Sequence, residues 1–231
     1  MLSIGTIYPN LKSLIEFDDV IELERNHKNL NSKIELINVN NSELFIKILN
    51  KEDFDYGIIL TDNTGKNKIY FLNNISILSK EENNIQINSF FLGTTKGIFK
   101  IWKEYFENGL TEYNQWKKVK QCEKQAWLEL ALSFQNINYE NLKSTIEIDG
   151  VDIKSLNDFF CSIGEALNGK GGYFGRDLYG FYDCLRSPEF GTQNLKTVIW
   201  KNHKKSKWKL KNNFSRILKT FNEFNIDVQL R

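Results

Sequence analysis

One carboxylate, Asp183, lies among aromatic residues in the segment GGYFGRDLYGFYDCLRSPEFG, residues 171–191. Asp177 is predicted to cap the start of a short helix there, because a short acidic side chain accepts hydrogen bonds from the free N–H groups of the first turn. Gly175 precedes it and permits a tight entry with positive φ, and Gly180 permits the close approach of another group. The segment therefore predicts a helix that begins at a tight turn and carries a charge.

The two faces of this helix differ in chemistry. At about 100° per residue, the face predicted to be buried consists of Leu178, Phe181 and Leu185. The opposite face carries Tyr179, Tyr182, Asp183 and Arg186. Aromatic side chains supply contact area at a small entropic cost and exclude water around a charge, so such a face is suited to binding another protein. The alternative is a structural role, in which this face packs on the N-terminal half and Asp183 and the tyrosine hydroxyls are hydrogen-bonded internally.

The composition is that of an ordinary globular protein. The 231 residues suffice for one large domain or two small ones, and a formal charge of +2 does not by itself indicate a nucleic-acid partner. The N-terminus lacks the basic and apolar regions of a signal peptide, and no apolar run is long enough to span a bilayer. Cys122, Cys161 and Cys184 are widely spaced, which favours reduced, buried thiols in a cytoplasmic protein.

The first part of the chain mixes the patterns of strands and helices. Period-two alternation and β-branched runs predict strands at 33–40 and 84–93 and a hairpin at 56–72. Helical spacing predicts helices at 42–50, 96–109 and 114–134. The apolar stripes are Leu44, Ile48 and Leu49 in the first of these helices and Trp116, Val119, Ala126 and Leu130 in the last. Residues 1–140 are therefore predicted to form an α+β domain of unknown type, with a boundary in the polar segment 135–145.

Beyond residue 145, strands alternate with helices. The predicted strands are 145–150, 195–202 and 226–230. One predicted helix carries Asp183, and another is 155–169, with Ser155 or Asn157 as its cap and Gly169 as its stop. The third is 213–225, in which Phe214, Ile217, Leu218 and Phe221 lie at helical spacing. Strands joined through helices form right-handed crossovers, so this region is predicted to be an α/β domain with a small parallel sheet.

The sequence GGYFGRDLYGFYDCL, followed by TVIW and FNEFNIDVQL, resembles the barstar family of ribonuclease inhibitors. The preceding IEIDGVDIKSLNDFFCSIGEAL resembles the opening strand and first helix of that family. The resemblance covers residues 145–231 and implies a barstar-like domain with three parallel strands. It also implies that the helix and the loop before it enter the active site of a nuclease, where the carboxylate of Asp183 takes the place of an RNA phosphate.

The helix face and the resemblance together give the candidate partner-binding residues Tyr173, Phe174, Gly175, Arg176, Asp177, Tyr179, Tyr182, Asp183, Arg186 and Glu223. The resemblance implies that Asp183 meets cationic groups of the enzyme, with Tyr173 and Tyr182 beside it. Two features depart from the family pattern. Tyr179 stands where a second acid is expected, one turn before Asp183. Residues 145–231 also contain 14 Lys and Arg against 10 Asp and Glu, a difference of +4, whereas a negative charge favours steering toward a basic nuclease.

A second hypothesis concerns the segment KNHKKSKWKLK, residues 201–211, which contains six lysines and a tryptophan. Cations and an aromatic ring together bind phosphate backbones and bases. The alternative nucleic-acid-binding residues are Lys204, Lys205, Lys207 and Trp208. Charge runs are more often solvated helix faces, so nucleic acid is not the expected partner. Lys170 lies among glycines but lacks the spacing of a phosphate-binding loop.

The sequence offers little support for a metal site or for catalysis. His27 and His203 are the only histidines and lie far apart, and no Cys/His spacing fits zinc. A thiol enzyme based on Cys161 or Cys184 would need a base, and His203 is the only histidine in that half. We therefore expect a cytoplasmic immunity protein, or antitoxin, that has no cofactor or enzymatic activity. It is expected to bind and inhibit a protein toxin, in the first instance a ribonuclease. The alternative is a nucleic-acid-binding or adaptor protein that uses residues 201–211.

Overall fold

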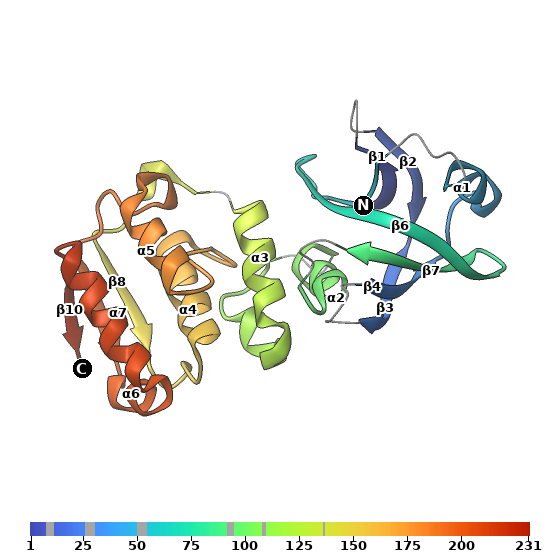
Figure 1. Cartoon of the computed structure of the whole chain (residues 1–231). Helices are drawn as coiled ribbons and strands as arrows, with labels where there is room; N and C mark the ends of the chain where they lie inside the picture. Colours follow the sequence, from blue (N-terminus) through green and yellow to red (C-terminus); the bar gives the residue numbers. More distant parts are fainter. Residues whose placement is uncertain (8–11, 26–30, 50–54, 92–94, 108–109, 136) are drawn as a thin grey trace. The chain divides into compact units, whose positions relative to one another are not determined.

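Figure 1 shows the computed structural model of the chain, which describes all residues except 8–11, 26–30, 50–54, 92–94, 108–109 and 136. The chain forms two compact units, Met1–Lys103 and Glu104–Arg231. The boundary indicated by the sequence at 135–145 falls inside the second unit, because helix α3 (Lys124–Phe134) packs on helix α4 (Leu156–Asn168). The described residues do not include His27 or the predicted element ends at 50, 92–93 and 108–109.

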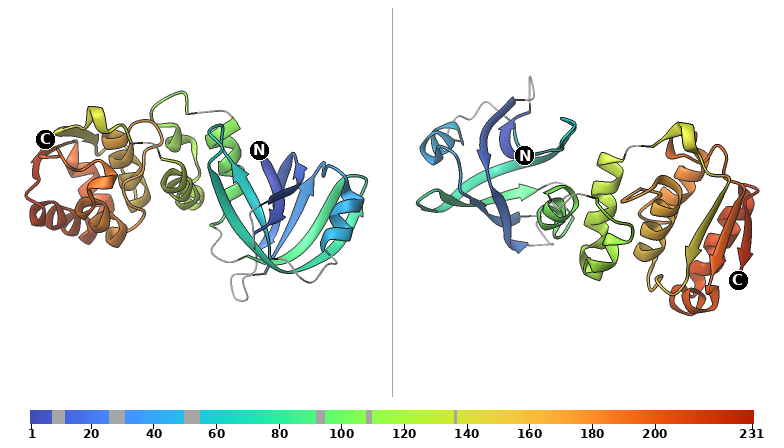
Figure 2. Two further views of the ribbon diagram at one scale, coloured as in Figure 1. Left: turned by 90° about the horizontal axis from the view of Figure 1, so that it is seen from above. Right: turned by 180° about the vertical axis from the view of Figure 1, so that it is seen from behind.

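The first unit is built on an antiparallel sheet with the strand order β2-β1-β5-β6-β7-β4-β3. Its strands are β1 (Leu2–Thr6), β2 (Lys12–Phe17), β3 (Asp19–Arg25), β4 (Asn31–Ile37), β5 (Tyr56–Thr61), β6 (Asn67–Glu81) and β7 (Asn84–Phe91). The sheet is strongly twisted and curved (Figure 2). The predicted hairpin and the strands near 33–40 and 84–93 are confirmed, whereas β1, β2 and β3 were not predicted.

Helix α1 (Ser42–Leu49) is confirmed, but its predicted buried face is wrong. Phe45 is fully buried and anchors the helix, while Leu44 is 43% exposed and Ile48 only half-buried. A helix of two turns buries a narrow stripe, so a single large aromatic side chain decides which face is inward.

The predicted helix at 114–134 is interrupted. It consists of two 3₁₀ turns, Gln115–Lys118 and Gln121–Glu123, followed by α3. Val119 and Lys120 between the turns have extended backbone, with ψ of 134° and 144°. All four residues of the predicted stripe, Trp116, Val119, Ala126 and Leu130, are nevertheless buried. Burial of the stripe was therefore predictable from spacing, whereas the break in the helix was not. The predicted helix at 96–109 is α2 (Ile98–Trp102) followed by a π-helical turn, Lys103–Glu107.

The second unit contains a three-stranded parallel sheet in the order β10-β9-β8, as predicted. Its strands are β8 (Thr145–Asp149), β9 (Thr197–Lys201) and β10 (Asp227–Leu230). Its helices besides α3 and α4 are α5 (Leu178–Arg186), α6 (His203–Leu210) and α7 (Asn212–Glu223). Phe159 stacks on Trp200 at 5.4 Å between ring centroids and meets Phe181 edge-on at 5.5 Å, so α4, β9 and α5 share one aromatic core.

The predicted helix ends of α4 are confirmed. The Ser155 hydroxyl accepts a hydrogen bond from the Asp158 N–H at 3.2 Å, and Gly169 ends the helix at a φ of 83°. In α7, the buried residues are Phe214, Ile217 and Phe221. None of the described helices is long and apolar enough to cross a membrane.

Candidate functional site

Helix α5 begins where the sequence predicts. Asp177 has extended backbone with a φ of −151°, and its carboxylate accepts a hydrogen bond from the Gly180 N–H at 2.8 Å. Gly175 has a φ of 92°, and a Cβ atom there would lie 2.8 Å from the backbone nitrogen of Phe181. Only glycine combines this conformation with this close approach, so Gly175 fixes how the loop enters the helix.

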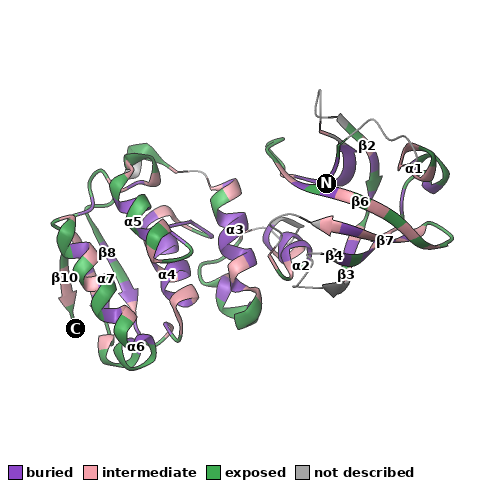
Figure 3. Ribbon diagram, in the orientation of Figure 1, coloured by how far each residue is buried: buried purple, intermediate pink, exposed green. Residues whose placement is uncertain are grey.

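The two faces of α5 are also as predicted. Phe181, Cys184 and Leu185 are buried and Leu178 is half-buried, while the outward face is exposed (Figure 3). On that outward face Tyr179 is 80% exposed and Tyr182 41% exposed, with Asp183 and Arg186 exposed beside them. Among the described residues, the Asp183 carboxylate has no hydrogen-bond or ion-pair partner. The alternative in which Asp183 is satisfied internally therefore receives no support, and its charge is available to a ligand.

Tyr182 connects α5 to the end of α7. Its ring meets Phe224 edge-on at 5.0 Å between centroids. Glu223, next in the chain to Phe224, is exposed, and its carboxylate lies 3.8 Å from the Lys219 ammonium, one turn earlier in α7. The structure thus brings the Glu223 end of α7 to the same region as the exposed face of α5.

The loop before α5 contains two buried aromatic residues. Tyr173 is 4% exposed and Phe174 is fully buried. Phe174 meets Phe181 edge-on at 5.8 Å, and Tyr173 packs at 6.0 Å from Phe190. Burial raises the pKa of the Tyr173 hydroxyl above its usual value. The Tyr173 ring is therefore buried, and the charge of Asp183 is among the causes that raise the pKa of its hydroxyl. Of the loop residues singled out, only Arg176 and Asp177 are exposed.

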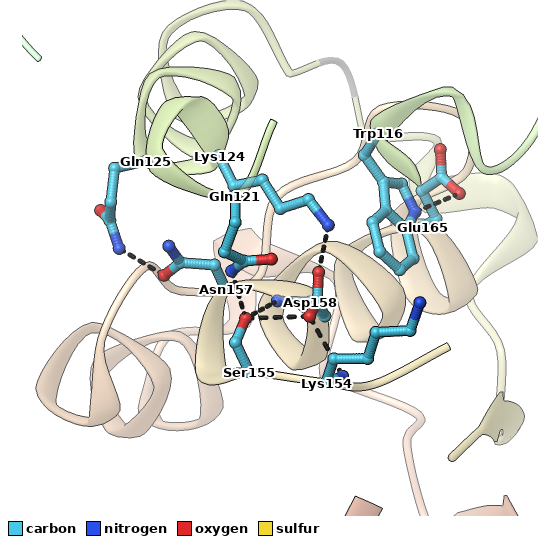
Figure 4. Close-up of polar contacts among 9 residues, drawn as sticks. All are labelled: Trp116, Gln121, Lys124, Gln125, Lys154, Ser155, Asn157, Asp158 and Glu165. Atoms are coloured by element: carbon cyan, nitrogen blue, oxygen red, sulfur yellow. Dashed lines mark hydrogen bonds and ion pairs between the residues drawn. The ribbon is translucent and has the colours of Figure 1, made fainter. Parts of the chain in front are cut away.

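Residues 104–107 and 110–134 form a brace against α4 and this loop, which the sequence did not predict (Figure 4). The brace meets α4 at the buried carboxylate of Glu165. That carboxylate accepts hydrogen bonds from the Trp116 indole N–H at 3.1 Å, the Asn114 N–H at 2.8 Å and the Gly171 N–H at 3.1 Å. Burial raises the pKa of Glu165, and these hydrogen bonds to the ionised form oppose part of the shift. One carboxylate thereby joins the brace, α4 and the start of the loop.

A buried ion pair joins α3 to the start of α4. The ammonium of Lys124, 8% exposed, contacts the carboxylate of Asp158, 1% exposed. Asp158 also accepts hydrogen bonds from the Ser155 hydroxyl at 2.9 Å and the Lys154 N–H at 3.1 Å, and Lys124 lies 4.9 Å from the centre of the Trp116 ring (Figure 4). A buried ion pair needs such additional hydrogen bonds to offset the free-energy cost of losing its hydration.

The loop is held at both ends by the brace. The Tyr105 hydroxyl donates to the Gly171 carbonyl at 2.7 Å, and the Gln125 amide donates to the Arg176 carbonyl at 3.0 Å. Lys170, considered above as a phosphate ligand, donates instead to the Thr111 carbonyl at 2.6 Å. The brace therefore fixes the backbone that leads into α5.

The basic segment 201–211 lies on a different element, helix α6. Ser206 and Leu210 are its buried residues, and Lys204, Lys205 and Lys207 are exposed. Trp208 is 72% exposed, and the Lys209 ammonium lies 4.4 Å from the centre of its ring.

Among the described residues, the two buried thiols and His203 have separate surroundings. Cys161 and Cys184 are buried, which raises the pKa of both thiols, that of Cys184 to about 12. The Nδ1 atom of His203 lies 3.0 Å from the Arg231 carbonyl oxygen. Within the described part of the chain, no three His, Cys, Asp or Glu side chains are grouped to hold a metal ion.

Comparison with known families gives one match. Residues 143–231 match the model of the family described as Barstar (barnase inhibitor). The match covers the parallel sheet with α4 to α7 and leaves out residues 104–142 of the same unit. The resemblance read from the sequence is therefore confirmed for the C-terminal domain. The Barstar family consists of non-enzymatic inhibitors that bind a ribonuclease. No curated protein matches the chain in sequence.

Proposed function

We propose that the protein is an immunity protein that neutralises a toxin ribonuclease by blocking its active site. The exposed face of α5 enters the site, and the Asp183 carboxylate occupies the position of an RNA phosphate. The observation that carries the proposal is the unpaired, exposed Asp183 flanked by Tyr179 and Tyr182, at the position where a Barstar family match predicts the contact helix.

The chemistry of the face supports this mode of inhibition. A ribonuclease binds its substrate through cationic groups, and a carboxylate presented among aromatic rings is attracted to such groups while water is excluded around it. Tyr179 stands where the family pattern has a second acid, so the face offers the contact area of an aromatic ring there in place of a negative charge. Glu223, near Tyr182, supplies further negative charge.

The arrangement also supports inhibition without turnover. Asp183 has no neighbouring base, thiol or hydroxyl within hydrogen-bonding distance among the described residues. A stoichiometric inhibitor needs none, because a stable complex alone stops RNA cleavage. The excess of positive charge in residues 145–231 is concentrated on α6 and the residues flanking it, away from the α5 face.

The test is a titration of ribonuclease activity. Purified full-length protein is added to barnase, and to ribonuclease recovered from native lysate by affinity capture on the same protein, and cleavage of a fluorogenic RNA is followed. We expect inhibition at one-to-one stoichiometry with at least one of these enzymes. Asp183→Arg places like charge against the cationic site and is expected to weaken inhibition at least 100-fold, or about 3 kcal/mol.

The matched control is Glu140→Arg, an equal change of charge at an exposed residue that lies outside the matched region. It is expected to leave inhibition unchanged, and both variants are checked for an unaltered unfolding transition. Inhibition that survives Asp183→Arg, or is lost equally in both variants, would show that the α5 face is not the inhibitory surface. No inhibition of either enzyme would reject the proposed function.

A further inference from the structure

A surface hollow of about 370 Å³ opens beside α6. It is lined by Gly150, Val151, Ile153, Lys154, Lys205, Trp208 and Lys209. The turn after β8 and the helix after β9 supply these residues, so the hollow lies at the carboxyl ends of two neighbouring parallel strands (Figure 1). In open α/β sheets, this edge is where ligands bind.

The hollow is fixed in shape by close packing between its two sides. A Cβ atom on Gly150 would lie 2.5 Å from the carbonyl oxygen of Asn202 and 2.8 Å from the Ser206 hydroxyl oxygen. The Asn202 amide donates to the Asp149 carboxylate at 2.9 Å, which joins the two strand ends. The turn and α6 are therefore held together in the absence of any ligand.

Trp208 is the unusual residue of this surface. It is 72% exposed, whereas the other four tryptophans, Trp102, Trp116, Trp127 and Trp200, are at most 2% exposed. An exposed indole does not contribute the large stabilisation of the fold that burial of its ring would give. Its exposed ring, with the Lys209 ammonium 4.4 Å from its centre, forms a flat aromatic surface beside positive charge.

The charges around the hollow are predominantly positive and available. Lys154, Lys205 and Lys209 are exposed and have no ion-pair partner among the described residues. The nearby acids are engaged: Asp149 accepts the hydrogen bonds of the strand ends, Asp152 pairs with Lys117 at 2.6 Å, and Glu147 pairs with Lys201 at 2.7 Å. Such a surface is suited to an anion that carries a planar group.

We propose that this hollow binds single-stranded nucleic acid, with one base stacked on Trp208 and the adjoining phosphates on Lys154, Lys205 and Lys209. Stacking on an exposed aromatic ring and cations along the backbone are the two contributions by which such strands are bound without sequence preference. The site lies on α6 and is independent of the α5 face, so it holds whether or not Asp183 inhibits a ribonuclease.

The test uses tryptophan fluorescence, since Trp208 is the one exposed tryptophan of the five, all of which the structure describes. The probes are an RNA strand and a DNA strand of about 12 nucleotides, a nucleoside monophosphate, and heparin as a polyanion without bases. We expect the strands to quench the fluorescence and protect Trp208 from iodide. We also expect the logarithm of the binding constant to fall against the logarithm of salt with a slope of about −2, for three phosphate contacts.

Variants of the full-length protein locate the binding. Trp208→Ala is expected to weaken strand binding about tenfold, measured by anisotropy of a labelled strand. Lys205→Glu with Lys209→Glu is expected to abolish it. Lys196→Glu is the matched control, because Lys196 is exposed just before β9, at the amino ends of the strands. Asp183→Arg is expected to leave strand binding unchanged.

The outcomes separate the possible ligands. Tighter binding of the strands than of the nucleotide supports the proposal. Equal binding of both would overturn it, because the adjoining phosphates would then contribute nothing. Heparin binding as tight as that of the strands, without protection of Trp208, would overturn it, because only charge would then be recognised. Strand binding that is unaffected by Trp208→Ala, or that falls equally with Lys196→Glu, would also overturn it, as would the absence of binding.

Discussion

The indole N–H of Trp116 donates a hydrogen bond of 3.1 Å to the carboxylate of Glu165, 49 residues later in the chain. Both side chains are buried, and the same carboxylate accepts the Gly171 N–H at the start of the loop that leads into α5. The matched Barstar region begins at residue 143, so Trp116 lies outside it. The Barstar-like domain of this protein is therefore supported by residues that precede the matched region.

The stability of the second unit should depend on the protonation of Glu165. Burial raises the pKa of this carboxyl, so the folded state binds its proton more tightly than the unfolded state. Stability is then expected to fall as the pH rises from the unfolded-state pKa through the folded-state pKa, and to stay constant above it. Glu165→Gln removes this titration.

The measurement is urea unfolding of the unmodified protein and of Glu165→Gln at a series of pH values. The free energy of unfolding of the unmodified protein, relative to the variant, should decrease with rising pH in that window. Glu189→Gln, a change at an exposed residue, leaves Glu165 in place and should therefore retain this decrease with rising pH. A relative stability that increases with pH would contradict the assignment of burial as the main cause.

Breaking the buried ion pair should be costly. Lys124→Met leaves the Asp158 carboxylate buried without its cation, and we expect a loss of about 3–5 kcal/mol in the free energy of unfolding. Adding Asp158→Asn should recover part of the loss, because the amide retains an acceptor for Ser155 and Lys154 and carries no charge. Denaturant unfolding of both single variants and the double variant measures the coupling energy. Additive effects would mean that the two side chains do not stabilise one another.

The brace should stabilise the fold of the family region. A fragment of residues 104–231 is expected to unfold cooperatively, whereas residues 143–231 alone would expose Glu165 and leave Asp158 without Lys124. We expect the shorter fragment to show a lower thermal midpoint and faster cleavage in limited proteolysis. Equal midpoints for the two fragments would show that the brace adds nothing to stability.

The entry into α5 should tolerate no side chain at Gly175. Gly175→Ala combines a positive φ with a Cβ atom 2.8 Å from the Phe181 nitrogen, so the first turn of α5 must move. Gly65→Ala is the matched control, since Gly65 has a φ of 83° but open space around its Cβ position, and it should cost only about 1 kcal/mol. Thermal unfolding and ribonuclease inhibition are measured for both. A loss of stability no greater than that of Gly65→Ala would contradict the steric argument.

Helix α5 was predictable because its signals are local. Asp177, Gly175 and the spacing of Phe181 and Leu185 lie within one short segment, and each acts on its nearest turn. The same holds for the cap of α4 at Ser155 and for the order of strands and helices beyond residue 145. These features follow from backbone conformation and periodicity, which a sequence displays directly.

The brace was not predictable because its contacts join distant residues. Nothing in the spacing of Trp116 identifies Glu165 as its partner, and the stripe that contains Trp116 fits burial against any apolar surface. Tyr173 illustrates a second limit, since an aromatic residue in a glycine-rich loop is compatible with a surface contact or with the core. Packing against Phe190 decides it, and that contact depends on the whole domain.

The hydrogen bonds that the loop backbone forms with Tyr105, Gln125 and Glu165 have a consequence for the kinetics of association. The conformational entropy of residues 171–176 is lost when the chain folds, so little of it remains to be lost when a partner arrives. When a loop is ordered before binding, the affinity of its complexes is determined mainly by their dissociation rate. The lifetime expected for a complex formed through α5 therefore depends in part on Tyr105, Gln125 and Glu165, which lie outside that helix.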